Sequence, residues 1–234
     1  MACQSMHASL KVLIFGIIGL SLGIVPPVQG QDATVYVVTY IEVAPSASSQ
    51  GASLLKQFGT ASRKDDGNLR FDVVQRTAPS NQFVYVAIWR DQKAFEANRD
   101  AAHTKQFAGA IQPHLIAPFD QRVHTGMAAM PPGGPSVGAG AVYVATHVDV
   151  PPPLKDKCVE ALQELVAGSR KEAGVVRFEV FQQGNRPNHF TVVETWKGEA
   201  EYLAHITAAH TKKFRDQLGP MTGALYDERL YKAL

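Results

Sequence analysis

Residues 190–214 read FTVVETWKGEAEYLAHITAAHTKKF, and this stretch decides the expected fold. Its first seven residues are mostly β-branched or aromatic and predict a strand, Gly198 marks a turn, and the remainder predicts a helix. Residues 83–107 read FVYVAIWRDQKAFEANRDAAHTKQF and repeat the pattern. Trp196, His210 and Phe214 recur there as Trp89, His103 and Phe107, whereas Ala87 and Asn98 replace Glu194 and His205. The two copies therefore differ at polar positions where chemistry would be expected.

The duplication extends over most of the chain. An offset of 107 residues aligns Val35-Tyr36-Val37 with Val142-Tyr143-Val144, and Ser62-Arg63-Lys64 with Ser169-Arg170-Lys171, with no gap thereafter. We therefore predict two repeats, residues 33–125 and 141–234, joined by a Pro- and Gly-rich linker at 126–140 that cannot pack a core. Each repeat is short enough that packing against the other would add stability.

Hydrophobic periodicity predicts the order β-α-β-β-α-β within each repeat. Apolar residues alternate along the first strand, and a helix near residues 94–111 or 200–218 follows the third strand. This order is typical of the α+β class, as a ferredoxin-like, four-stranded antiparallel sheet with both helices on one face. The bare faces of the two sheets predict sheet-to-sheet packing into one pseudo-dimeric α+β barrel. The residues expected between the sheets are Tyr36, Tyr40, Tyr85, Tyr143 and His147.

The first thirty residues differ from the rest in character. An apolar run of about fourteen residues follows Lys11, too short to span a bilayer comfortably, and Pro26-Pro27 ends it. We interpret residues 1–30 as a signal peptide with cleavage near Gln31, so the mature chain would be exported to the periplasm or secreted and keep no stable membrane span. An uncleaved anchor is the alternative.

Composition narrows the class of partner. Lysine plus arginine number 23 and aspartate plus glutamate 21, with no basic stripe, so nucleic-acid binding has little support. A small or apolar partner is expected instead. Cys158 would be the lone cysteine of the mature chain and is interpreted as a buried apolar residue.

The strand order, the repeat length and the motif Glu194-Thr195-Trp196, followed by Ala204-His205, His210 and Phe214, resemble the antibiotic biosynthesis monooxygenase family of dimeric α+β barrels. The resemblance implies a dimer fused into one chain, with a second-repeat pocket near the family pattern and a degenerate first pocket. Characterised relatives oxygenate quinols and polycyclic phenols without a cofactor, degrade haem, or act in stress responses. Haem-degrading relatives carry an asparagine where this chain has Thr39 and Thr146, which disfavours the haem alternative.

Several residues of the predicted pockets have both a functional and a structural interpretation. Thr39 and Thr146 are expected to point into the space between sheet and helices, where each hydroxyl group would hydrogen-bond either a ligand or a neighbouring residue. Glu194 stands among large apolar groups, so it is either a base with a raised pKa or the partner of Arg177 or Arg229 in a salt bridge. Trp89 and Trp196 either stack on a flat ring or belong to the core.

The histidines do not predict a metal site. On one helix, the separation of five positions from His205 to His210 corresponds to about 140 degrees, so the two side chains would leave different faces. We expect His205 to face the pocket as an acid or base, and His210, like His103, to have a structural role.

The resemblance, together with the absence of any cofactor motif, implies a cofactor-independent monooxygenase that oxidises a quinol or phenolic aromatic with dioxygen. The catalytic candidates are His205, Glu194, Trp196 and Thr146; the candidates for binding substrate, mostly in the degenerate pocket, are Trp89, Asn98, Thr39, His103 and His210. The sequence has no Gly-rich phosphate loop, nucleophile elbow or cysteine-histidine spacing, so neither cofactor nor metal is predicted. A non-catalytic stress-response or small-molecule-binding barrel and a haem protein are the alternatives, and further homodimerisation stays open.

Overall fold

The computed structural model describes residues 33–133, 137–224 and 226–234. The predicted signal peptide, residues 1–30, lies outside the described residues, as does part of the predicted linker. Within the described residues, no helix is both long and apolar enough to cross a membrane.

Both repeats have the predicted element order, with one additional helix each. The first repeat contains β1 (Val35–Glu42), α1 (Ser48–Ser62), β2 (Asn68–Arg76), β3 (Gln82–Trp89), α2 (Gln92–Asp100), α3 (Ala102–Ile111) and β4 (Asp120–Ala128). The second contains β5 (Val142–Asp149), α4 (Lys155–Ser169), β6 (Val175–Gln183), β7 (His189–Trp196), α5 (Glu199–Thr207), α6 (Ala209–Leu218) and β8 (Asp227–Ala233). Four 3-10 turns accompany the helices: η1 (Pro45–Ala47), η2 (Gln112–His114), η3 (Pro152–Leu154) and η4 (Gly219–Met221).

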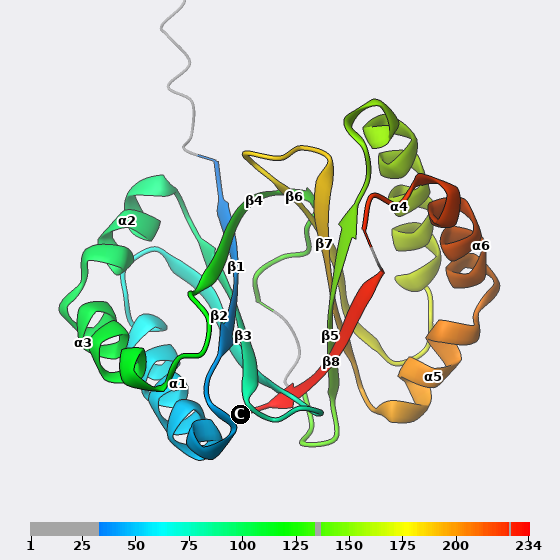
Figure 1. Ribbon diagram of the computed structural model, residues 1–234. Helices are drawn as coiled ribbons and strands as arrows, with labels where there is room; N and C mark the ends of the chain where they lie inside the picture. The colour runs from blue at the N-terminus through cyan, green and yellow to red at the C-terminus, as the bar shows by residue number, and fades with distance from the viewer. Residues whose placement is uncertain (1–32, 134–136, 225) are drawn as a thin grey trace, which may run out of the picture. The chain divides into compact units, whose positions relative to one another are not determined.

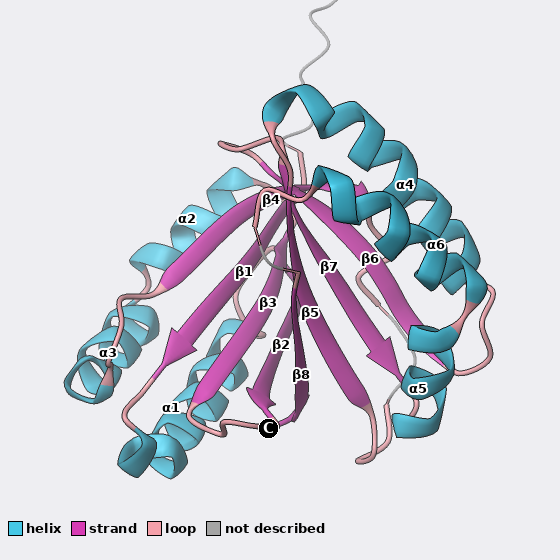
Figure 2. Cartoon of the chain, turned by 45° about the vertical axis from the view of Figure 1, so that its right-hand side comes forward, coloured by secondary structure: helices cyan, strands magenta, loops and turns pink. Residues whose placement is uncertain are grey.

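The eight strands form one closed barrel in the order β1-β3-β2-β8-β5-β7-β6-β4. Within each repeat the strands pair antiparallel, and the two sheets are joined where β2 pairs with β8 and β4 pairs with β6. The helices of each repeat cover the outside of its own sheet (Figures 1 and 2). This arrangement confirms the predicted pseudo-dimeric α+β barrel, and the strands that the structure describes have no open edge.

Strand alternation divides the core into three clusters. One lies between sheet and helices in each repeat, and the third fills the barrel interior with Val38, Val86, Phe181, Val193 and other buried side chains. Tyr36, Tyr40 and Tyr143 pack against the interior cluster, as predicted. Tyr85 does not, because it shares the parity of Phe83 and Trp89 and therefore faces the helices; its predicted place between the sheets was wrong.

The helix expected after the third strand is interrupted in both repeats. Ala101 separates α2 from α3 and Ala208 separates α5 from α6, and both have φ −64° and ψ 149°, which is an extended conformation. The prediction of a single helix near residues 94–111 and near residues 200–218 was therefore wrong. The break redirects the chain between the two histidines of the second repeat.

Two glycines set the turn before the second strand of each repeat. Gly67 and Gly174 have φ of 78° and 85°, and a Cβ on Gly174 would lie 2.2 Å from the Glu201 side chain. Only glycine adopts this conformation at little cost. In the second repeat this tight turn follows directly after Glu172, whose side chain becomes important below.

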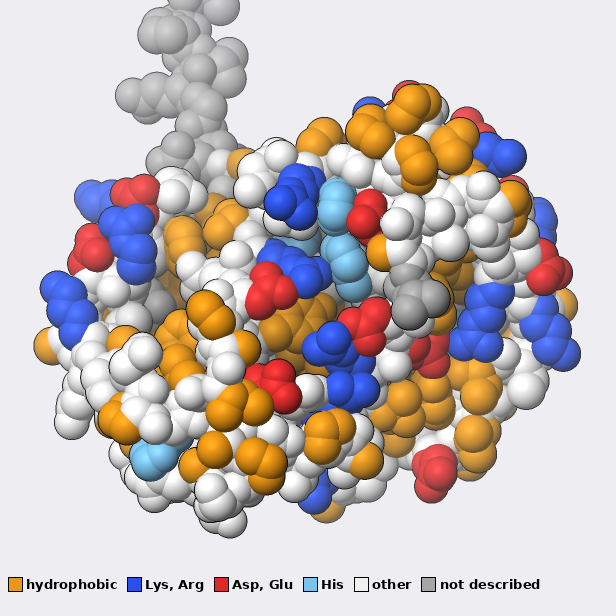
Figure 3. Space-filling view, in the orientation of Figure 1, with side chains coloured by type: hydrophobic (Ala, Val, Ile, Leu, Met, Phe, Trp, Pro, Cys, Tyr) orange, Lys and Arg blue, Asp and Glu red, His pale blue; other side chains and the backbone are white. Residues whose placement is uncertain are grey.

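The surface mixes charges of both signs. The face shown in Figure 3 presents lysine and arginine side chains beside aspartate and glutamate rather than a continuous basic stripe. Cys158 is fully buried, and burial raises the pKa of its thiol to about 12. Its interpretation as an apolar core residue is confirmed.

Candidate active site

The predicted catalytic residues of the second repeat lie on the helix-facing side of its sheet and on the adjoining helix. Glu194 and Trp196 share one face of β7, Thr146 lies on β5, and His205 faces them from α5. Alternation along β7 places Glu194 between Val192 and Trp196 on the same face. Glu194, Trp196 and His205 are each at most 3% exposed, so the site is closed to bulk water.

Glu194 is a buried carboxyl group with few polar neighbours. The Trp196 Nε1–H donates a hydrogen bond to its Oε2 at 2.8 Å, and His205 Nε2 lies 3.7 Å from the same oxygen. Burial raises the pKa of Glu194 to about 8, opposed by the hydrogen bond from Trp196. A carboxylate of this pKa is a stronger base than an ordinary glutamate, and the group is half ionised near pH 8.

The salt-bridge alternative for Glu194 does not occur. Arg177 donates to the carbonyl oxygens of Pro131 and Pro132, and Arg229 pairs with Asp227. Both guanidinium groups are therefore engaged elsewhere. Desolvation, rather than ion pairing, sets the ionisation of Glu194.

His205 is held between two carboxyl groups. Its Nδ1–H donates to Glu172 Oε1 at 2.6 Å, which leaves Nε2 as the acceptor facing Glu194. The imidazole also stacks on Trp196, with ring centroids 4.6 Å apart. Burial lowers the pKa of His205, and the bond to Glu172 opposes this shift. The ring is thereby fixed in position and in tautomer, next to the buried acid.

His210 joins the same group of side chains, contrary to the expectation from helix geometry. Its Nε2 lies 2.8 Å from Glu172 Oε1, and the His205 and His210 ring centroids are 5.9 Å apart. The extended residue Ala208 breaks the helix between them, so the 140-degree argument does not apply. Gly168 allows this packing, because a Cβ there would lie 2.5 Å from the His210 ring.

The Glu172, His205 and His210 side chains could in principle hold a metal ion. One carboxylate oxygen lies only 2.6 and 2.8 Å from the two nitrogens. Ligand atoms bound at 2.0–2.2 Å to one ion lie about 3 Å or more apart. These distances fit shared protons better than a shared ion.

Thr146 contributes an unpaired hydroxyl group. Its side chain is fully buried, and its Oγ1 has no hydrogen-bond partner among the described residues. On the same face, Glu228 lies directly opposite Thr146 on β8 and accepts hydrogen bonds from Tyr202 and Arg215. A buried hydroxyl without a partner leaves a hydrogen bond available to a ligand.

The first repeat has the same scaffold without the acid–base pair. Ala87 occupies the position of Glu194, and Asn98 replaces His205 and donates to Asp65 Oδ2 at 2.7 Å. His103 Nε2 lies 3.3 Å from the same Asp65 oxygen, as His210 lies near Glu172. Trp89 remains buried in the core.

Tyr85 fills the space that corresponds to the second-repeat site. It occupies the position of Val192, and its ring packs against Phe71 and Phe58 at centroid distances of 5.0 and 5.7 Å. Gln121 donates to the Tyr85 hydroxyl at 3.0 Å and lies 3.4 Å from Thr39 Oγ1. Thr39 is therefore satisfied by neighbours, whereas Thr146 is not. Of the predicted first-repeat residues, only His103 lines a cavity of about 150 Å³, which is formed with Phe58, Phe107 and residues of α1 and α3.

Sequence reasoning missed Glu172, Glu228, Tyr202 and Arg215. Glu172 lies in a polar turn far from the motif along the chain, and only the fold brings it to His205. The repeat alignment contained a signal for it, because Asp65 is the acidic residue at the equivalent position.

The closed barrel defines an α+β barrel protein, and its two repeats differ at the position where Glu194 lies beside His205. The sequence model of the antibiotic biosynthesis monooxygenase family matches residues 34–110 and 141–217. The chain belongs to this family and contains two copies of the family domain in tandem.

Individual relatives agree with this assignment. The chain is 28% identical over 81 residues to the "Putative monooxygenase YcnE" of Bacillus subtilis, covering 35% of this chain and 85% of that protein. A solved structure named "Putative monooxygenase" from Fusobacterium nucleatum superposes with a TM-score of 0.78 at 18% identity, covering 87% of this chain and 93% of the other. An "anthrone oxidase-like protein" superposes with a TM-score of 0.65 at 14% identity, covering 87% and 92%. At these identities the superpositions establish the fold alone.

Proposed function

We propose that the second repeat houses a cofactor-independent monooxygenase site that oxidises a quinol or another electron-rich phenol with dioxygen. The observation that carries the proposal is the buried Glu194 carboxyl group, with its raised pKa, 3.7 Å from a histidine of fixed tautomer. Family membership and the names of the relatives support a monooxygenase-like activity. The choice of a quinol or phenol rests on the chemistry that this site can perform.

The reaction needs no electrons beyond those of the substrate. A quinol with one free ring C–H and one molecule of dioxygen give a hydroxyquinone and one molecule of water. Removal of the phenolic proton makes the ring electron-rich enough to pass an electron to dioxygen. Recombination forms a C–O bond at the ring carbon, and cleavage of the O–O bond then releases water together with the proton from that carbon. The protein must only deprotonate, orient and exclude water.

Each residue of the site has a role in this scheme. Ionised Glu194 accepts the phenolic proton, and neutral His205 receives it at Nε2 while Glu172 stabilises the imidazolium through Nδ1. Glu172 and His210 are partly exposed, so the proton can leave to solvent along this path. Trp196 stacks against the bound ring, and the Thr146 hydroxyl donates to a substrate oxygen.

The closed site requires movement before a substrate can enter. The α5–α6 junction is irregular backbone close to His205 along the chain, because Ala208 is extended and interrupts the helix there. We propose that this junction opens to admit the substrate and closes to exclude water during the reaction.

Oxygen consumption with a panel of quinols tests the proposal. Glu194→Gln and His205→Ala should lower kcat/KM by about 10²- to 10⁴-fold, the usual contribution of a positioned general base. Asn98→Ala and Trp89→Phe are the matched controls in the first repeat and should leave kcat/KM near the wild-type value. If only the control variants lose activity, the active site lies in the first repeat and the proposal is wrong. A wild-type protein that consumes no oxygen with any quinol would leave the non-catalytic binding alternative.

A further inference from the structure

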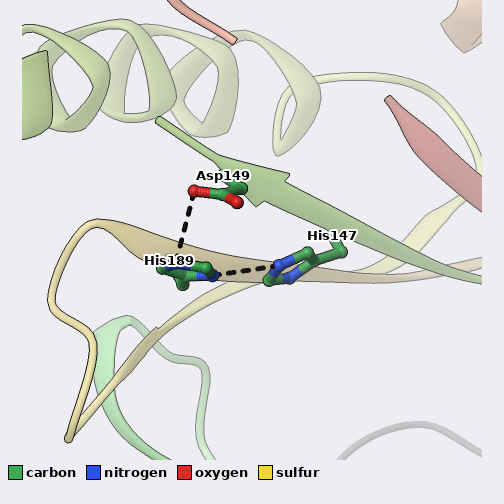
Figure 4. Close-up of side chains that lie close together, drawn as sticks. All are labelled: His147, Asp149 and His189. Atoms are coloured by element: carbon green, nitrogen blue, oxygen red, sulfur yellow. Dashed lines mark hydrogen bonds and ion pairs between the residues drawn. The ribbon is translucent and has the colours of Figure 1, made fainter. Parts of the chain in front are cut away.

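Three potential metal ligands lie together on the barrel side of β5 and β7, away from the Glu194 site. Figure 4 shows His147 and Asp149 projecting from β5 toward His189 of β7. Asp149 is paired directly with His189 across the two strands, and His147 lies two residues earlier on the same face of β5. Alternate residues of one strand and the facing residue of its neighbour lie close together on one side of a sheet, so their side chains converge.

The three side chains are close enough to share one ion. His147 Nε2 lies 3.3 Å from His189 Nδ1, which is about the separation of two atoms bound at 2.0–2.1 Å to a tetrahedral ion. Asp149 Oδ1 lies 3.3 Å from the other nitrogen of His189, Nε2, so this contact would be given up when one ion binds all three residues. One donor atom from each residue lies within 4.8 Å of the other two, so a common point exists at most about 2.8 Å from all three. Small rotations of the side chains would bring that point to bonding distance.

We propose that His147, Asp149 and His189 bind a divalent transition-metal ion of the zinc class, with water as the fourth ligand. Two imidazoles and one carboxylate suit zinc and its neighbours in the first transition row. The His189 and Asp149 side chains are 14% and 24% exposed, so an ion and its water ligand can reach the site.

The hydrogen bonding of the histidines agrees with this assignment. His147 Nε2 and His189 Nδ1 face each other at 3.3 Å. The two facing nitrogens can share only one hydrogen. Moreover, His147 Nδ1 is buried without a hydrogen-bond partner among the described residues. Without a metal ion, the hydrogen-bonding capacity of the cluster is therefore only partly used.

Neighbouring charges do not exclude a cation. Arg122 and Arg186 face the cluster and oppose a positive ion, but Arg122 is paired with Asp120 at 2.6 Å. Asp149 supplies the negative charge at the site itself.

The first repeat provides an internal comparison. The equivalents of His147, Asp149 and His189 are Tyr40, Glu42 and Gln82. Gln82 Nε2 donates to Glu42 Oε1 at 2.9 Å, which is an ordinary hydrogen bond between an amide and a carboxylate. A phenol and an amide are poor zinc ligands, so the proposed site is confined to the second repeat.

Calorimetric titration of untagged protein with zinc chloride tests this proposal, with cobalt(II) absorption as a second measurement. The wild type should bind one equivalent. His147→Ala and His189→Gln should weaken binding by at least the roughly 10- to 100-fold that loss of an outer partner costs at metal sites. Gln82→Ala, at the equivalent position of the first repeat, should bind as the wild type does, and circular dichroism should show that every variant is folded.

A further control separates this cluster from the Glu172, His205 and His210 group. His205→Ala should retain zinc binding if the ion lies at His147 and His189. Loss of binding in His205→Ala but not in His147→Ala would overturn the proposal, as would a wild-type protein that binds no zinc or cobalt. None of these measurements depends on oxygenase activity, so the two proposals can fail separately.

Discussion

The Arg70 guanidinium and the Glu179 carboxylate meet across the interior of the barrel, with Nη1 and Oε2 2.6 Å apart. Arg70 lies on β2 of the first repeat and Glu179 on β6 of the second, four strands away in the ring of eight. Both side chains are buried, and Glu179 is also 3.7 Å from Arg177. This ion pair joins the two repeats across the barrel interior, away from the backbone hydrogen bonds between neighbouring strands.

Glu179→Ala should therefore be strongly destabilising. Removal of Glu179 leaves the buried Arg70 charge with only the partly exposed Asp72 as its partner, and loss of one partner of a buried pair typically costs about 3–5 kcal/mol in the free energy of unfolding. Urea denaturation measures the change. Asp72→Ala is the control, because Asp72 also pairs with Arg70 but is 40% exposed, and an exposed pair contributes about 1 kcal/mol or less. Equal losses in the two variants would contradict the central role of Glu179.

Glu194 should make stability depend on pH. Its pKa is about 8 in the folded protein against an ordinary value of 4.5, so the folded state binds more protons than the unfolded chain between these two pH values. The resulting stabilisation is complete below about pH 4.5 and is lost progressively as the pH rises to about 8. Because glutamine does not ionise, the free energy of unfolding of Glu194→Gln should rise relative to that of the wild type by up to about 1.4 kcal/mol for each pH unit in this window. Paired denaturation curves from pH 5 to 8 measure the difference, and a difference that stays constant with pH would refute the raised pKa.

Val192→Tyr should block the second-repeat site without changing its polar residues. The first repeat already accommodates a tyrosine at this position, and Gln121 donates a hydrogen bond to its hydroxyl oxygen. In the second repeat Glu228 stands in place of Gln121 and would instead accept a hydrogen bond from the hydroxyl group. We expect oxygen consumption to fall to background while the melting temperature changes little. Val84→Ile, in the barrel interior, is a control for added volume in the core. Full activity in Val192→Tyr would show that substrate binds elsewhere.

The export of the chain remains a prediction from its first thirty residues. N-terminal sequencing of protein recovered from outside the cytoplasm should begin near Gln31 if the signal is cleaved. A chain that retains Phe15 and sediments with membranes would support the anchor instead.

The sequence predicted the fold because its information is local and occurs twice. Period-2 alternation identified the strands, and the offset of 107 residues paired the repeats, so closure of the barrel followed from two bare sheet faces. The break at Ala208 was missed because alanine is a good helix former, and neither glycine nor proline marks the position. Tyr85 was misplaced even though its parity matches Trp89, so that error was avoidable from the sequence.

The candidate site was predictable only in part. Glu194, Trp196 and His205 lie within twelve positions of one another and form a recognisable motif. Glu172, Glu228 and Arg215 reach them through strand pairing and the turn at Gly174, which short sequence patterns do not reveal. His147 and His189 are 42 positions apart and meet for the same reason.

Fusion of the two repeats has a consequence for how such a protein can change. In a symmetric dimer of identical chains, a tyrosine that filled one pocket would fill both, and the protein would lose its site altogether. In a single chain with two repeats, the two pockets can change independently. One half can carry packed aromatic rings around Tyr85 while the other half keeps Glu194 beside His205, and both halves share one closed barrel.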